Sequence, residues 1–199
     1  PAREAVRSLA SRRGLPGLLL PVILAGVIGA TSITGQVRAS DATIDGLHQG
    51  TGPLSGGKTL TLQVGGRADV PKDAAAVVLN VTAVTPWGPG HVTAFPCDRQ
   101  QPVASNLNYV PGDVVANLVI AKPDPSGKVC LYSHATSDLV ADVAGYFPAG
   151  SGYEPVTNPA RLLDTRAGGT TIDGTSAGAG PAAGGRSVRL RVTGRSDVP

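Results

Sequence analysis

The side chains of this sequence that could do acid–base or nucleophilic chemistry are few. Its three histidines are His48, His91 and His134. Ser133 and His134, with Asp138 or Asp142 nearby, have the residue types of a hydrolytic triad. However, the sequence has no Gly-x-Ser-x-Gly turn, and residues so close along one strand cannot all converge on one point. We therefore expect no catalytic residue and no enzymatic activity.

Metal-binding patterns are equally sparse. Asp164 lies between Arg161 and Arg166, which favours an ion-paired structural carboxylate over a calcium ligand. The segment from Asp41 to Asp45 lacks the density of oxygen ligands that a calcium loop needs. We expect no metal site and no cofactor.

A group of amide and aromatic side chains is the best candidate for ligand binding. It consists of Trp87, Asn106, Asn108, Tyr109 and Asn117. Neutral amides beside aromatic rings bind sugars through hydrogen bonds and stacking. The alternative is that the asparagines tie down backbone groups at turns and strand ends.

The two cysteines, Cys97 and Cys130, each lie at the edge of an apolar segment. In an oxidising compartment such an isolated pair usually forms a disulfide. A metal site would need further Cys or His ligands nearby, and a thiol nucleophile would not need a second cysteine. We predict a Cys97–Cys130 disulfide.

The net charge of +3 comes from the N-terminal segment. Five of the 17 basic residues and one of the 14 acidic residues precede Ser40, so the remaining 12 basic and 13 acidic residues give a net charge of −1. A nucleic-acid-binding protein needs a basic surplus. Nucleic acid is therefore not an expected partner.

The first 39 residues have the layout of an export signal. Basic residues Arg3, Arg7, Arg12 and Arg13 precede an uncharged apolar stretch over 15–28, and residues 37–39 (VRA) offer a cleavage site. Residues 11–15 also partly resemble a twin-Arg signal, which leaves the export route open. The alternative is an uncleaved N-terminal anchor, the one expected contact with a membrane, although the apolar run is short for a span.

The chain contains an internal repeat with an offset of 128 residues. GGKTLTLQVGGRADVP at 56–71 recurs as GGRSVRLRVTGRSDVP at 184–199, and TIDG at 43–46 recurs at 171–174. A period this long corresponds to a whole domain. Since the chain begins at Pro1 and stops at Pro199 in mid-pattern, we expect a piece of a longer protein in which the second copy is truncated.

The two copies indicate a half-buried strand followed by a turn. Apolar residues hold every second position from Leu60 to Val64, while the residues between them, Thr61 and Gln63, change to arginine in the second copy. Gly-Arg-x-Asp-Val-Pro then forms a turn, in which Arg67 and Asp69 either pair or are both solvated.

Short strands separated by Gly- and Pro-rich turns follow, with no helical period outside the signal segment. The expected strands cover 75–85, 91–95, 106–109, 114–121, 128–133 and 138–147. The continuous apolar run at 75–85 suggests a central strand covered on both faces. The pattern predicts an all-β fold, an antiparallel β-sandwich or barrel-like module, after an apolar helical signal segment.

Five segments carry a family resemblance. They are PARLLDTR (159–166), VVLNVT (77–82), ASNLNY (104–109), ANLVIAK (116–122) and ADVAGYF (141–147). Together they resemble a tandem repeat module of exported actinobacterial surface and secreted proteins, where it occurs beside wall-active or protease domains. The resemblance covers about residues 43–199 and implies a β-rich module with a secreted or surface location, but no reaction.

One departure concerns the first copy. At the same offset, the RLLDTR motif should recur at 33–38, but the chain there reads ITGQVR. The first copy therefore lacks a strand or borrows one, or the gene model is faulty.

These observations predict three regions and two competing functions. The regions are a signal peptide or anchor (1–39), a first β repeat module (40–150), and a linker with the truncated start of a second repeat (151–199). The first functional hypothesis is a non-catalytic structural or adhesive repeat module at the cell envelope. The second is a carbohydrate- or cell-wall-binding accessory module of a larger secreted hydrolase, with cell-wall polysaccharide or another envelope component as its partner.

Overall fold

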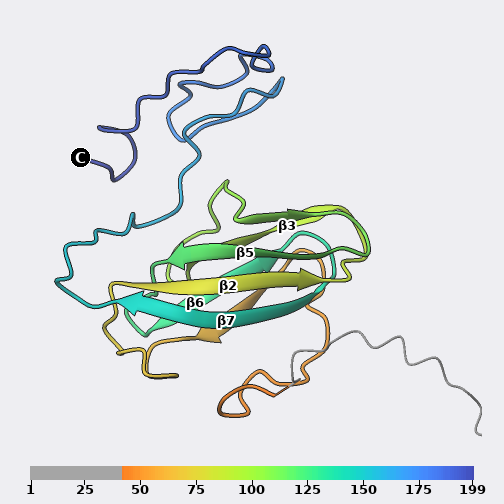
Figure 1. The fold of residues 1–199 in the computed structure, drawn as a ribbon, viewed down its shortest axis with the longest axis vertical. Coiled ribbons are helices and arrows are strands. Elements are labelled where there is room, and N and C mark those ends of the chain that lie inside the picture. Colours follow the sequence, from red (N-terminus) through yellow and green to blue (C-terminus); the bar gives the residue numbers. More distant parts are fainter. Residues whose placement is uncertain (1–41) are drawn as a thin grey trace, which may run out of the picture. The chain divides into compact units, whose positions relative to one another are not determined.

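The computed structural model describes residues 42–199, so the predicted signal segment and the departure at 33–38 lie outside the described residues. Within 42–199 the fold is all-β, with seven strands and no helix (Figure 1). The strands are β1 (Lys58–Gln63), β2 (Ala76–Val84), β3 (Gly90–Pro96), β4 (Leu107–Tyr109), β5 (Val114–Ala121), β6 (Lys128–Ser133) and β7 (Asp138–Phe147).

The strands form two antiparallel sheets that share one core. The four-stranded sheet has the order β1-β6-β3-β4, and the three-stranded sheet has the order β5-β2-β7. Buried side chains of both sheets, among them Val92 and Leu131 from the first and Leu79 and Val119 from the second, belong to a single hydrophobic cluster. This is the two-layer arrangement of a β-sandwich.

Strand β1 shows the predicted alternation with one correction. Leu62 and Val64 are buried and Thr61 is exposed. Gln63, expected to be merely wet, instead donates hydrogen bonds from Nε2 to the backbone oxygens of Gly65, Ser126 and Gly127 at 2.9–3.1 Å. Its amide therefore holds the β5–β6 turn against the end of β1.

Strand β2 is central in its sheet, as expected, but the prediction that both its faces are covered is wrong. Val77, Leu79, Val81 and Ala83 are buried, whereas the side chains between them are only half-buried. The neighbouring strand β5 likewise exposes Val114, Leu118 and Ile120. The reason is that the sheet packs against the core on one side only, so a continuous apolar run does not distinguish a doubly covered strand from a singly covered one.

Residues 148–199 contain isolated bridges but no strand. In particular, Val188, Leu190 and Val192, which correspond to Leu60, Leu62 and Val64 of β1, are exposed. Strand β1 forms by pairing with β6 from Lys58↔Ser133 to Gln63↔Lys128. Within residues 42–199 the segment at 188–192 pairs with no strand, and without such a partner it does not form one.

Candidate functional site

Tyr109, one of the five predicted ligand-binding residues, is part of the core. Its side chain is 4% exposed. The hydroxyl lies 2.9 Å from Ser133 Oγ, accepts a hydrogen bond from Ala135 N at 3.0 Å and donates to Ala135 O at 3.3 Å. The ring is therefore not available to stack on a sugar, and the expectation for this residue is wrong, because alternation along β4 places it on the buried face.

Asn106 and Asn117 bind protein backbone, as the alternative interpretation expected. Asn106 Oδ1 accepts from Ala94 N at 2.8 Å, and Asn117 Nδ2 donates to Asn106 O at 2.5 Å. Asn106 N also donates to Val92 O at 2.9 Å. These bonds continue the β3–β4 pairing and link it to β5, so both amides support the sandwich.

Trp87 lies alone on the β2–β3 loop. The residue is 75% exposed, and its backbone N–H donates to Thr136 O at 2.8 Å. Within residues 42–199, no hydrogen bond or ring contact joins Trp87 to the asparagines. The five predicted residues therefore do not form one binding patch.

Asn108 is the remaining predicted residue, and it lines an open cleft of about 710 Å³. It lies opposite His91 in the β3–β4 register. The cleft is also lined by the β3–β4 loop, which spans residues 97–106, and by the RLLDTR segment, residues 161–166. Asn108 is exposed, so its amide is free to meet a ligand there.

His91, which lines this cleft, stacks on the imidazole of His134. The ring centroids of His91 and His134 lie 5.2 Å apart, and the ring centroid of Tyr132 lies 5.8 Å from that of His91. Partial burial, followed by the nearby charges of His134 and Arg161, lowers the pKa of His91. His91 is therefore favoured in its neutral form, which both donates and accepts hydrogen bonds.

Ser133 is not arranged as a nucleophile. It is fully buried, and its hydroxyl donates to Ala135 O at 2.8 Å besides contacting Tyr109. Among residues 42–199, no hydrogen bond joins it to His134, Asp138 or Asp142. These contacts make Ser133 a fastening point between β6 and β4.

Asp164 is ion-paired, as predicted. Arg166 donates from Nε and Nη2 at 2.9 and 2.6 Å, and Arg161 donates from Nη1 at 3.2 Å. The Arg166 hydrogen bonds, with a smaller contribution from the Arg161 charge, hold the pKa of Asp164 well below its usual range. In the described part of the chain, no three His, Cys, Asp or Glu side chains are grouped as a metal site would require.

Arg67 binds Asp45, not Asp69 as considered above. Its Nε and Nη2 each donate to an Asp45 oxygen at 2.6 Å, and its Nη1 donates to Gln63 O at 2.9 Å. We call this group of contacts the Asp–Arg clamp. It fastens the turn at 43–47 to the end of β1, and its bidentate hydrogen bonds lower the pKa of Asp45 to about 2.

The second copy repeats the clamp at the equivalent positions. Arg195 donates two hydrogen bonds to Asp173 at 2.7 Å, and its Nη1 donates to Arg191 O at 3.0 Å. The hydroxyl of Thr171 reaches Thr175 O as that of Thr43 reaches Leu47 O. The clamp therefore forms even where the adjacent strand does not. Both partners recur at the 128-residue offset, and this was the signal in the sequence that could have identified the pair.

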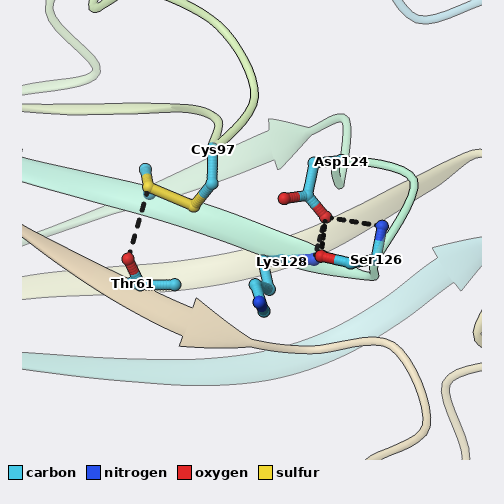
Figure 2. Close-up of a disulfide and its surroundings, with 6 residues drawn as sticks. Thr61, Cys97, Asp124, Ser126 and Lys128 are labelled. Atoms are coloured by element: carbon cyan, nitrogen blue, oxygen red, sulfur yellow. Dashed lines mark hydrogen bonds between the residues drawn. A yellow bond between two sulfur atoms is a disulfide. The ribbon is translucent and has the colours of Figure 1, made fainter.

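The predicted disulfide is present. Cys97 and Cys130 are bonded, with Cα atoms 5.0 Å apart, and no free cysteine remains (Figure 2). Thr61 Oγ1 lies 3.7 Å from Cys130 Sγ. On the turn before β6, Asp124 Oδ1 accepts from Ser126 N, Ser126 Oγ and Lys128 N at 2.7–2.9 Å. The disulfide joins the start of the β3–β4 loop to the middle of β6.

Comparisons with known proteins give no relative for this chain. No protein-family model, curated protein or solved structure matches it. In the segment from 42 to 199, no helix has the length and apolar character needed to cross a membrane.

Proposed function

We propose that this chain is a non-catalytic, extracellular structural repeat module that serves as a spacer or adhesive element at the bacterial cell envelope. The observation that carries the proposal is the Asp–Arg clamp. It recurs in both copies with the same donors and acceptors, while the exposed Thr61 is replaced by Arg189. Because both copies keep the clamp while this exposed position changes from neutral to cationic, the copies share a structural contact and not a binding surface at Thr61.

The disulfide supports the extracellular location. Disulfides persist in oxidising compartments and are rare in the cytosol. The export-type pattern of residues 1–39 points the same way. A β-sandwich cross-linked by a disulfide suits a module that must endure outside the cell.

The alternative is a carbohydrate- or cell-wall-binding accessory module. The open cleft favours it, because Asn108, Ser105 and His91 line it and offer neutral hydrogen-bonding groups. Against it stand the burial of Tyr109 and the backbone hydrogen bonds that occupy Asn106 and Asn117. The cleft therefore retains one of the three predicted amides and neither predicted aromatic ring.

Co-sedimentation of the oxidised chain with insoluble peptidoglycan and with insoluble polysaccharide separates the two functions. A structural module should stay in the supernatant, or should sediment equally well after Asn108→Ala. Saturable sedimentation that Asn108→Ala abolishes, while the matched loop variant Trp87→Ala retains it, would establish the alternative. Release of soluble fragments from either polymer would refute the non-catalytic role.

A further inference from the structure

The segment that opens the second repeat contacts the first module. Asn158 Nδ2 donates to Gln100 O in the β3–β4 loop at 3.2 Å. Farther along, Arg161 and Leu163 line the same cleft as His91 and Asn108. The second repeat therefore begins against the loop that Cys97 anchors.

The backbone of this segment is meanwhile held by the second copy. Ile172 N donates to Arg161 O at 2.9 Å, Asp164 N donates to Ser176 O at 3.1 Å, and Gly178 N donates to Asp164 O at 2.8 Å. The backbone of the segment thus forms hydrogen bonds within its own repeat, while its side chains line the cleft of the preceding module. It forms a bridge between the two repeats.

A hydrogen bond within the second repeat lies beside basic residues of the first module. Asp197, from the second Gly-Arg-x-Asp-Val-Pro turn, accepts from Thr157 N at 3.0 Å. This hydrogen bond, with the nearby positive charges of Lys122 and Arg99, lowers the pKa of Asp197. Thr157 lines another cleft together with Arg99 and Lys122. An acidic side chain of the second repeat thus lies near two basic side chains of the first module.

We propose that the start of each following repeat docks on the β3–β4 loop of the module before it, with Asn158 and Arg161 at one end of the interface and Asp197 at the other. The occupant of this surface is the next copy of the same repeat. Consecutive modules are then fastened by specific contacts, not only by the linker at 148–156. The disulfide gives this docking loop a fixed base at Cys97. The inference rests on the proposed role as a repeat array.

The first test of the docking is an NMR titration of His91 in the whole chain. The Arg161 charge disfavours protonation of His91, so Arg161→Gln should raise the His91 titration midpoint measured by NMR. The matched control is Arg189→Gln, an exposed arginine of the same repeat, which should leave the midpoint in place. An unchanged midpoint in Arg161→Gln, in a protein whose strand amides keep their wild-type shifts, would overturn the docking of this segment.

Thr157 provides the second, independent test. Asp197→Asn weakens the acceptor of the Thr157 amide and removes the attraction to Lys122 and Arg99, so exchange of the Thr157 amide hydrogen should become faster. Asp69→Asn is the matched control, since Asp69 occupies the same turn of the first copy and is exposed. Equal exchange rates in wild type and Asp197→Asn would overturn this end of the interface. Neither readout involves envelope binding, so a failure here is distinct from a failure of the proposed function.

Discussion

At the residue scale, the molecule is defined by polar side chains that bind backbone or one another. Asn106 ties β3 to its loop, Gln63 holds the β5–β6 turn, and Arg67 joins Asp45 to the end of β1. Because these groups are satisfied within the protein, they are poor candidates for ligand contacts. Asn108 and His91 differ, since they border an open cleft.

Residue types alone could not identify these roles. Asn106, Asn108 and Asn117 look alike in the sequence, and only the register of β3 with β4 and the approach of β5 separate the two structural amides from the exposed one. For Arg67 the sequence did contain the answer, since Asp45 and Arg67 both recur in the second copy. Asp69 recurs as well, and nearness along the chain made it the more obvious partner.

The clamp predicts a pH-dependent contribution to stability. The pKa of Asp45 falls from 3.8 to about 2 on folding, so its contribution is complete above pH 3.8 and is lost as the pH falls toward 2. Asp45→Asn should therefore lower the melting temperature at neutral pH. The difference in melting temperature between wild type and Asp45→Asn should shrink as the pH falls from 3.8 toward 2. Thermal unfolding followed by circular dichroism measures both. A difference that is constant across the window would show that the ion pair contributes nothing.

At the element scale, the sequence predicts the strands well and their surroundings less well. Strands β5, β6 and β7 have the expected bounds, and the others differ by one or two residues at either end. These segments combine β-branched residues with Gly- and Pro-rich turns, which are local signals. The number of covered faces is not local. It depends on what packs against the sheet, which is why the outward face of β2 was assigned wrongly.

The alternation of β1 predicts unequal effects of two neighbouring substitutions. Leu62 is buried, so Leu62→Ala should destabilise the fold by about 2–5 kcal/mol, the usual cost of truncating a core aliphatic side chain. Thr61 is exposed, and its counterpart in the second copy is Arg189, so Thr61→Arg should change stability little. Gln63→Arg is a poorer control because Gln63 binds three carbonyl oxygens. Equal losses in denaturant unfolding for Leu62→Ala and Thr61→Arg would contradict the assigned faces.

The disulfide makes a prediction about the loop that it closes. Cys97 and Cys130 are 33 residues apart, and in the chain-entropy model such a cross-link stabilises a fold by roughly 3–4 kcal/mol. Reduction of the disulfide should therefore lower the free energy of unfolding by roughly this amount, which denaturant unfolding measures. Thiol titration of the protein, purified and denatured without reductant, should find no free thiol. Two free thiols per chain would contradict the pairing.

At the scale of the whole molecule, the strands lie between residues 58 and 147, and the second copy supplies only its opening segments. The internal repeat predicts a boundary near residue 150 between the two copies, which stays a prediction. What it could not reveal is the contact between Asn158 and Gln100, because that contact joins residues far apart in the chain through side-chain geometry.

Limited proteolysis tests this division. Gly150, Ser151 and Gly152 are exposed and lie outside every strand, so a protease of broad specificity should cut there first. The fragment ending before the cut should persist, since it contains both sheets. Mass spectrometry of the first products identifies the site. Initial cleavage within β2 or β6 would show that the sandwich is not the stable unit.

The central claim, that the module is structural and non-catalytic, is tested most directly by NMR of the oxidised chain mixed with soluble peptidoglycan fragments. One set of spectra reports binding through the protein amides and cleavage through the fragments' own resonances. A structural, non-catalytic module should show unchanged amide shifts around His91, Ser105 and Asn108, and intact fragments after prolonged incubation. Saturable shifts clustered on those three residues, or the appearance of cleaved fragments, would contradict it.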